Sequence, residues 1–327
     1  MINNKIQLEP NNATLNIYLH EDKEIRNAIL VFPGGAYQYC APGEGEPVAK
    51  AYYEEGFNTF VLEYSCLQGI FGSPKKDKDE VFDSALEDGM NAFYYLQDHH
   101  EEFFINKNKI SIVGFSAGAN LALATVNLGG IRPLSLILGY GAYSKELFKT
   151  LDIGDHDLLN EVKDDNPPLF MFLCQADSTV PASESMMLGN IYAQKKLPFE
   201  IHCYVAGDHG LSLGTKDSGV VNKDYATWFN HSLSFLKNIQ RDTPLILGDI
   251  EDDLNNISIE SRIGALMYNQ EAWKVIEEML PDIAFKAKTD SMMKSRPLQR
   301  IWRWGLISEP SEEEVDERLK KINRKGE

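Results

Sequence analysis

Short apolar runs alternate with amphipathic stretches along the first 240 residues of the chain. The apolar runs are rich in β-branched residues, which predicts strands at 13–20, 27–32, 57–63, 109–113, 134–139, 169–174 and 200–205. Between them, apolar side chains recur at helical spacing, which predicts helices at 46–55, 79–99, 117–128, 183–195 and 225–239. This alternation predicts an α/β fold, with a mainly parallel sheet covered by helices on both faces.

The pattern changes after residue 240. Strand-like runs stop, charged residues and tryptophans become frequent, and the spacing predicts helices at 258–267, 269–280 and 311–323. Ser311 and Glu314 have the spacing of a capping box, and Pro281 should stop the second of these helices. We therefore expect an α/β domain at 1–240 and a folded helical extension at 241–327.

The strongest local signal is KISIVGFSAGANLALATVNL at residues 109–128. A buried strand passes into a helix through GFSAG, a G-x-S-x-G pentapeptide centred on Ser116. So sharp a bend brings the residues two before and two after the serine too close for side chains, which explains both glycines. The bend lifts the Ser116 hydroxyl above the sheet edge, over a helix N-terminus that favours developing negative charge. The pattern predicts a nucleophile; the alternative is a turn that only packs the helix on the sheet.

A second segment, GLSLG at 210–214, also fits G-x-S-x-G. No predicted strand ends directly before it, and the TKDSG that follows is typical of a turn rather than a helix. We therefore interpret Ser212 as part of a surface loop. The pentapeptide alone is a weak signal, and only its strand–turn–helix setting favours Ser116.

A serine nucleophile needs a base to take its proton and a carboxylate to orient that base. In an open α/β sheet these groups should follow the carboxyl ends of strands. Asp177 lies just beyond the strand at 169–174, and His209 lies just beyond the last strand. We expect Ser116 as nucleophile, His209 as base and Asp177 as acid. The alternatives are a solvated turn for His209 and a helix cap for Asp177.

Weaker candidates for the base and the acid lie on a long irregular segment. His156 is the only rival histidine, because the others fall in helices or strands or at their ends. Asp155 and Asp165 do not directly follow a strand. Asp208 adjoins the predicted base in sequence and therefore cannot easily orient its ring.

Backbone N–H groups are the natural donors to the oxyanion of an acyl-transfer intermediate. Ala117, the residue after the nucleophile, should supply one. Gly34 and Gly35 directly follow a central strand and should supply the second or both donate, although the pair also suits an ordinary strand-to-helix turn. No cluster has metal-ligand spacing, and the glycine pair lacks the lysine of a phosphate-binding loop. We expect neither a metal nor a cofactor.

Four blocks of sequence carry a family resemblance: FPGGAYQYCAPGEGEPVAKAYYEEGFNTFVLEY, GFSAGANLA, QADSTVP and GDHGLSLG. Together they resemble the α/β-hydrolase esterases of the acetyl-esterase and acetyl-xylan-esterase-like group, over about residues 27–236. The resemblance implies an α/β-hydrolase fold, the nucleophile at Ser116, the acid at Asp177, the base at His209 and an oxyanion loop at Gly34-Gly35.

Two small departures from the group are visible. Ala36 and Ala119 stand where many members have glycine, and neither change casts doubt on activity. The tail at 258–323 is similar to a small helical module found at the carboxyl end of some carbohydrate-active enzymes. All predicted catalytic residues precede this tail, so we expect it to be separable from the chemistry.

Composition limits the partners. The net charge of −17 and pI of about 4.9 argue against binding nucleic acid or anionic membranes. The start of the chain does not resemble a signal peptide, and no apolar stretch is long enough to span a bilayer, so we expect a cytoplasmic protein. Cys174 and Cys203 fall in strand-like runs and are interpreted as buried thiols.

These observations predict a serine carboxylesterase that removes small acyl groups, such as acetyl, from a sugar or polyol. The segment at 141–168, where lids are commonly inserted in this fold, is short and polar, with Leu158, Leu159 and Val162 as its small apolar surface. We therefore expect short acyl chains. The alternatives are a peptidase or amidase with the same triad, and an inactive hydrolase fold that binds carbohydrate or protein. The natural substrate and the oligomeric state stay open.

Overall fold

The computed structural model describes residues 2–240 and 250–323 of the chain. They form two compact units, Met1–Phe235 and Leu236–Glu327, each with its own hydrophobic core. The domain boundary expected from the sequence lies a few residues after the boundary between these units.

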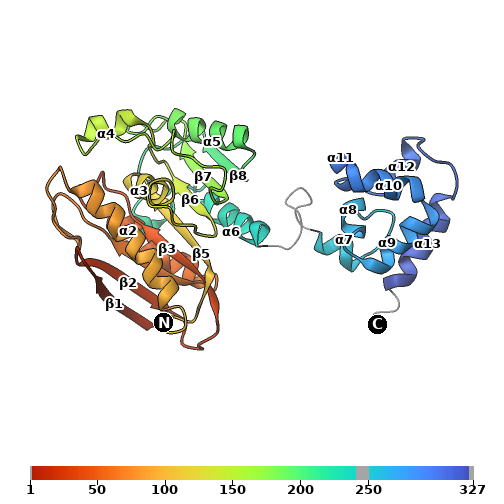
Figure 1. Cartoon of the computed structure of the whole chain (residues 1–327), viewed down its shortest axis with the longest axis horizontal. Coiled ribbons are helices and arrows are strands. Elements are labelled where there is room, and N and C mark those ends of the chain that lie inside the picture. Colours follow the sequence, from red (N-terminus) through yellow and green to blue (C-terminus); the bar gives the residue numbers. More distant parts are fainter. Residues whose placement is uncertain (1, 241–249, 324–327) are drawn as a thin grey trace. The chain divides into compact units, whose positions relative to one another are not determined.

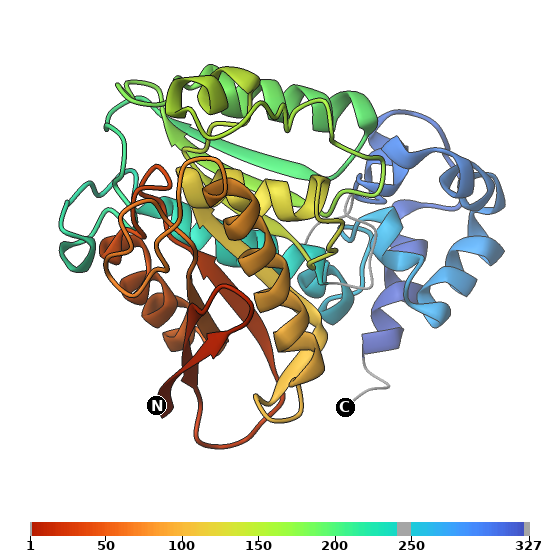
Figure 2. The same cartoon turned by 60° about the vertical axis from the view of Figure 1, so that its left-hand side comes forward.

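The first unit is built on an eight-stranded sheet in the order β1-β2-β4-β3-β5-β6-β7-β8 (Figure 1). Its strands are β1 (Ile2–Leu8), β2 (Ala13–Leu19), β3 (Arg26–Phe32), β4 (Asn58–Glu63), β5 (Ile105–Phe115), β6 (Leu136–Gly139), β7 (Leu169–Cys174) and β8 (Phe199–Tyr204). The strands from β4 to β8 in this order run parallel, whereas β2 is antiparallel to both β1 and β4. The predicted α/β fold with a mainly parallel sheet is confirmed. Figure 2 shows the strand direction turning across the sheet.

The sequence pattern did not predict β1. This strand forms an edge hairpin with β2, in which Leu8 pairs with Ala13. It is rich in polar residues; Leu8 is buried in the core, and the partly buried Ile6 packs against it. An edge strand with one neighbour and little buried surface lacks the apolar run on which the prediction depended.

Helices cover both faces of this sheet, as predicted. Apolar side chains of α2 (Val81–Asp98), α3 (Ala117–Asn127) and α5 (Ser183–Lys195) share one core cluster with alternate strand residues such as Met171. On the opposite face, the next strand residue, Phe172, stacks on Trp228 of α6 (Thr227–Ile239) with ring centroids 3.9 Å apart.

The second of these faces also carries α1 (Glu46–Glu54), beside α6. Tyr52 of α1 packs against Phe229 of α6, and its hydroxyl lies 2.7 Å from Ser232 Oγ. Because β3, β5, β7 and β8 are parallel, the loops that follow them meet at one edge of the sheet. Those loops carry the predicted site residues.

The regular elements that the structure describes in the second unit are all helices. Its helices are α7 (Glu251–Asn255), α8 (Ile263–Leu266), α9 (Gln270–Met279), α10 (Pro281–Thr289), α11 (Ser291–Lys294), α12 (Arg300–Arg303) and α13 (Glu312–Asn323). The expected helix at 258–267 is wrong over its first half, since Arg262 N–H bonds to the Asp253 side chain instead. Pro281 follows the end of α9 as predicted, and it also opens α10 in the first turn. The capping box is confirmed: Glu314 N–H donates to Ser311 Oγ, and Ser311 N–H donates to Glu314 Oε2.

Candidate active site

Ser116 sits at the bend between β5 and α3, in a left-handed conformation with φ of 50°. A Cβ on Gly114 would lie 2.4 Å from Gly118 O, and one on Gly118 would lie 2.0 Å from Phe32 O. Neither gap admits a side chain, so both glycines are required for close backbone approach, as the sequence predicted. Positive φ at a non-glycine residue is strained, and such strain persists where the surrounding structure enforces it.

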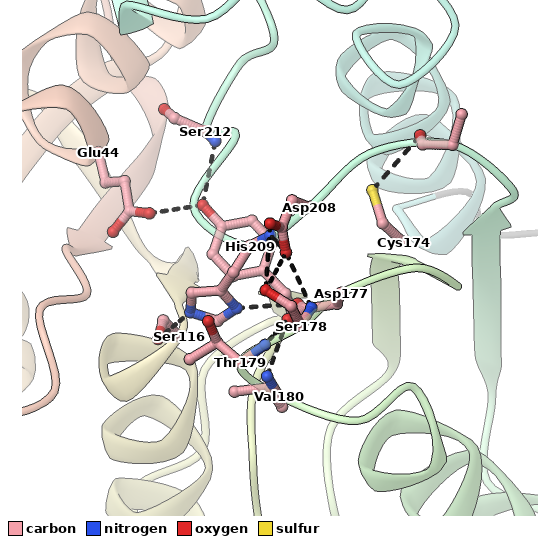
Figure 3. Close-up of polar contacts among 12 residues, drawn as sticks. Glu44, Ser116, Cys174, Asp177, Ser178, Thr179, Val180, Asp208, His209 and Ser212 are labelled. Atoms are coloured by element: carbon pink, nitrogen blue, oxygen red, sulfur yellow. Dashed lines mark hydrogen bonds and ion pairs between the residues drawn. The ribbon is translucent and has the colours of Figure 1, made fainter.

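The structure brings the three residues predicted as a triad into contact (Figure 3). Ser116 Oγ lies 2.8 Å from His209 Nε2, and His209 Nδ1 lies 2.8 Å from Asp177 Oδ2. The Asp177 side chain is 1% exposed and that of His209 is 18% exposed. The base is therefore open on one side, while the carboxylate is shielded from water.

These contacts fix the direction of the hydrogen bonds. The ionised carboxylate of Asp177 can only accept, so His209 Nδ1 carries the proton and donates it. In the neutral ring, Nε2 is then the acceptor and faces the hydroxyl of Ser116. This tautomer is the one in which a histidine can take a proton from serine.

Asp177 is held as an anion. Its second oxygen, Oδ1, accepts hydrogen bonds from the N–H groups of Thr179 and Val180, at 2.9 and 2.8 Å. Burial opposes the ionisation of Asp177, but the hydrogen bonds from His209 and from these two N–H groups outweigh it and lower the pKa of the carboxyl. Both oxygens are therefore occupied by donors that favour the charged form.

Asp208 does not orient the imidazole, as the sequence argument expected, but it connects two loops of the site. Its Oδ1 accepts from the N–H and Oγ of Ser178, at 2.8 and 2.9 Å, and from the N–H of His209 at 2.8 Å (Figure 3). The pKa of Asp208 is lowered chiefly by the Ser178 N–H, followed by the His209 N–H. The loop with the acid and the loop with the base are thereby tied together.

The oxyanion prediction needs a correction at Gly34. Its N–H donates to Glu44 Oε2 at 2.7 Å, so it is already bonded inside the protein. A Cβ at Gly34 would lie 2.9 Å from Ser116 Cβ, which explains the glycine by close approach to the nucleophile. The expected role of Gly34 as an oxyanion donor is at odds with this geometry.

Donors remain one and two residues further along the loop. No described residue accepts a hydrogen bond from the N–H of Gly35 or of Ala36. Both have positive φ, 120° and 54°, so the chain makes a left-handed turn directly beside Ser116. Ala117 opens α3, and the first N–H groups of a helix have no acceptor within it. Sequence reasoning did not consider Ala36 as a donor, because its side chain does not signal a left-handed turn.

Ser212 is not on a surface loop, which corrects the second sequence expectation. It is 1% exposed, and its Oγ donates to Gly43 O at 2.7 Å. Its N–H donates to Tyr140 Oη at 3.0 Å, and its carbonyl accepts from Trp228 Nε1 at 2.9 Å. Ser212 is a fully bonded turn residue of the interior.

The other candidates lie elsewhere. His156 packs against Phe82, with ring centroids 4.6 Å apart. Asp155 pairs with Lys145, and Asp165 pairs with Arg132. None of the three contacts the site residues.

Two further expectations concern thiols and metals. Cys174 is buried as expected, whereas Cys203 is exposed, because it lies on β8 at the sheet edge. Within residues 2–240 and 250–323, no three His, Cys, Asp or Glu side chains are grouped so that they could hold a metal ion. Among the helices in this part of the chain, none has both the length and the apolar character that a bilayer span requires.

Comparisons with known proteins show the family to which this fold belongs. The family model BD-FAE matches residues 15–132. The crystal structure of an α/β-hydrolase enzyme from a Medee basin deep-sea metagenome library is 30% identical, with a TM-score of 0.63 over 72% of this chain and 98% of that one. The chain belongs to the α/β-hydrolases. Its fold is therefore that of its family, and Ser116, Asp177 and His209 follow one another along the chain in the order serine, acid, histidine that is typical of this fold.

Two curated relatives of this hydrolase carry names linked to xylan. Endo-1,4-beta-xylanase B of Butyrivibrio fibrisolvens is 31% identical over 228 residues, which are 61% of this chain and 35% of the relative. The acetylxylan esterase of Xylanibacter ruminicola is 25% identical over 225 residues, which are 62% of this chain and 44% of the relative. The hydrolase thus spans less than half the length of either relative. The similarities confirm the resemblance to the acetyl-esterase-like group.

Proposed function

We propose that this hydrolase is a serine carboxylesterase that removes short acyl groups, above all acetyl, from a carbohydrate or polyol. The observation that carries the proposal is the continuous chain Asp177–His209–Ser116, with both contacts at 2.8 Å and the serine at a strained elbow. A serine hydroxyl becomes a useful nucleophile only when such a base stands within hydrogen-bond reach.

In the first half-reaction, Ser116 Oγ attacks the ester carbonyl while His209 Nε2 takes the hydroxyl proton. The new Oγ–carbon bond gives a tetrahedral intermediate, and the charge on the imidazolium is offset by buried Asp177. As the intermediate collapses, the bond to the alcohol oxygen breaks. His209 then returns the proton to that oxygen, and the sugar or polyol leaves as a free alcohol.

The oxyanion of the intermediate needs donors that are aligned before the reaction. We assign this role to the N–H groups of Gly35 and Ala117, with Ala36 as a third donor. Each removed donor of this kind typically costs about 10²- to 10³-fold in kcat.

In the second half-reaction, water attacks the acyl-enzyme. His209 takes one proton from the water and passes it to Ser116 Oγ as the ester bond to the enzyme breaks. The products are the free serine and the carboxylic acid. No group beyond the triad and the backbone donors is needed to balance this sequence.

The acyl group should be short because the apolar side chains described in the segment at 141–168 face the main core rather than a substrate. Phe148, Ile153, Leu158 and Val162 are all buried in the main core, and Leu159 packs against it. A methylene gains about 0.8 kcal/mol only if an apolar surface covers it. An acetyl group needs no such surface.

The carbohydrate or polyol side of the proposal is supported by the names of the relatives, which link them to xylan. A cytoplasmic location stays a prediction from the sequence, and the absence of nucleic-acid and membrane partners stays a prediction from its acidic composition. The role of the helical unit stays open.

Acetate release from acetylated xylo-oligosaccharides by the purified full chain tests the proposal, with p-nitrophenyl acetate and p-nitroacetanilide as model ester and amide. We expect release from the saccharide and from the ester, with far slower amide cleavage. Preferential amide cleavage would favour a peptidase or amidase. No reaction with any of the three would point to an inactive binding protein.

A further inference from the structure

A buried carboxylate, Glu44, lies behind the candidate site and takes no part in the triad. It is 5% exposed and ends the short 3-10 helix Pro42–Glu44. Its Oε2 accepts from Gly34 N–H at 2.7 Å, and its Oε1 accepts from Tyr140 Oη at 2.5 Å. A buried anion costs free energy unless its oxygens are occupied by donors. Both oxygens of Glu44 are occupied, and by segments far apart in the sequence.

The direction of the network follows from its end points. Ser212 N–H can only donate, so Tyr140 Oη accepts from it at 3.0 Å. The one hydroxyl proton of Tyr140 is therefore directed to Glu44 Oε1. Glu44 receives two donors and has no described acceptor for a proton of its own, so the arrangement fits the ionised carboxylate.

The network joins the two loops that the proposed chemistry requires. At one end, Gly34 precedes the free N–H groups of the left-handed turn. At the other end, Ser212 lies three residues after the base, His209. Between them, the ring of Tyr140 packs edge-on against the imidazole of His209, with centroids 4.9 Å apart. Ser212 Oγ closes a second link through Gly43 O, beside Glu44.

We propose that Glu44 is a positioning residue that, through Tyr140, clamps the oxyanion loop to the histidine loop. Its bond to Gly34 N–H holds the Pro33–Gly34 peptide, and Ala41 N–H, three residues before Glu44, donates to Gly34 O at 2.9 Å and holds the peptide that carries the Gly35 N–H. Its bond to Tyr140 fixes the position of the Tyr140 ring, which packs against the imidazole of His209. The catalytic consequence rests on the esterase function proposed above, whereas the clamp itself is a feature of the fold.

The charge of Glu44 adds a pH dependence. Burial raises the pKa of Glu44, while Tyr140, Gly34 N–H and nearby His209 oppose that rise. Tyr64 and Tyr225 also lie within its electrostatic reach. As the pH falls through this raised value, the carboxyl gains a proton and loses an acceptor. The clamp should then loosen at a pH above the ordinary 4.5 of a glutamate.

The test is Glu44→Gln in the full chain. The amide keeps one acceptor oxygen but presents N–H to Tyr140, whose own proton is then left without an acceptor. A misplacement of about 1 Å far from the chemistry can cost about 10²-fold in rate. We expect kcat for p-nitrophenyl acetate to fall about 30- to 100-fold with KM nearly unchanged. The decrease in activity that protonation of Glu44 causes in the wild type as the pH falls should be absent from the variant.

Asp88→Asn is the matched control. Asp88 is 1% exposed, its Oδ2 accepts from Ser65 N–H at 2.8 Å, and burial raises the pKa of its carboxyl. The substitution makes the same chemical change to a buried carboxylate outside the site. We expect kcat within threefold of wild type. Tyr140→Phe should match Glu44→Gln, and the double variant should be no worse than either single one, because both break one unit.

Amide hydrogen exchange supplies a readout that does not depend on catalysis. In Glu44→Gln and Tyr140→Phe, exchange should accelerate in residues 33–45 and 207–214, whereas Asp88→Asn should leave both segments protected. Unchanged exchange together with normal kcat in Glu44→Gln would overturn the clamp. An inactive wild type with the expected exchange pattern would instead overturn the esterase function and leave the clamp standing.

Discussion

The chain contains the G-x-S-x-G pattern twice, as GFSAG at 114–118 and GLSLG at 210–214, and the two copies differ in almost everything except the φ angle of the serine. Ser116 and Ser212 both adopt a left-handed conformation, with φ of 50° and 51°. Yet Ser116 Oγ faces the imidazole of His209, whereas Ser212 Oγ donates to a backbone carbonyl inside the protein. A strained serine between two glycines is therefore not sufficient for a nucleophile.

The glycines of the two copies serve different purposes. Gly114 and Gly118 are needed because strand and helix approach so closely that a Cβ would collide with backbone. Gly210 and Gly214 instead supply positive φ, 75° and 67°, and a Cβ on Gly210 would meet open space. Close packing of a strand on a helix, rather than the letters of the motif, distinguishes an elbow from a turn.

The largest expected effect separates the two serines directly. Ser116→Ala should lower kcat for p-nitrophenyl acetate by about 10⁴- to 10⁶-fold, as loss of the nucleophile does in comparable triads. Ser212→Ala should lose less than tenfold in kcat, but about 1 kcal/mol of stability, because the partly buried carbonyl of Gly43 loses its donor. Steady-state kinetics and urea unfolding measure both. An inactive Ser212→Ala variant together with an active Ser116→Ala variant would show that Ser212, and not Ser116, is the nucleophile.

Substitution of Asp177, the acid of the triad, should have the next largest effect. Asp177→Asn should reduce kcat by about 10⁴-fold, because the amide can donate to His209 Nδ1 and thereby favours the wrong tautomer. Asp208→Asn is the control, since it keeps an acceptor for Ser178 and does not touch the ring. We expect it to retain at least a tenth of wild-type kcat. Near-normal turnover in Asp177→Asn would move the orienting role to another carboxylate.

The length of the acyl chain should have a smaller effect. Across p-nitrophenyl esters, kcat/KM should be highest for acetyl or propionyl and should fall at least tenfold by octanoyl. The apolar side chains that the structure describes in the segment at 141–168 are buried in the main core or pack against it, so they give longer chains little cover. A maximum at octanoyl or beyond would require an apolar acyl pocket and would reject the short-acyl proposal.

The smallest effect is a change of stability with pH. The lowered pKa of Asp177 means that its ionised form stabilises the fold above the ordinary value of 3.8, and that this contribution disappears as the pH falls through the lowered value. The difference in unfolding free energy between wild type and Asp177→Asn should therefore be full at pH 7 and shrink below about pH 4. Urea unfolding at pH 7, 5 and 3 measures it. A difference that grew on acidification would contradict the assigned ionised state.

The triad was predictable because each member follows a strand, and parallel strands bring their carboxyl ends to one edge. Glu44 was not predictable, because in GEGEP it looks the same as Glu46, whose side chain is half exposed. Only the fold shows that Glu44 meets Tyr140, almost 100 positions away in sequence. The glycine pair lies beside Ser116, as the sequence led us to expect, but the bonding of Gly34 N–H depends on Glu44, whose place the sequence does not indicate.

Strand β1 and the burial of Ser212 were not predicted from the sequence for the same reason: both depend on contacts with other segments of the chain. Strand β1 is stabilised by pairing with β2 at the sheet edge rather than by an apolar run of its own. The buried state of Ser212 depends on Trp228 and Gly43, which no local pattern near residue 212 reveals. Periodicity reports which face of an element is buried, but it does not report which distant backbone group will accept a hydrogen bond.

The central claim is that Ser116 alone is activated by His209, and covalent labelling of the full chain tests it most directly. The wild type and the variants Ser116→Ala, Ser212→Ala and His209→Ala would be treated with a fluorophosphonate, digested and mapped by mass spectrometry. We predict one label per chain, on the peptide that contains Ser116, in wild type and in Ser212→Ala, and no rapid label in the other two. Rapid labelling that persists in Ser116→Ala, or a label on Ser212, would contradict the account.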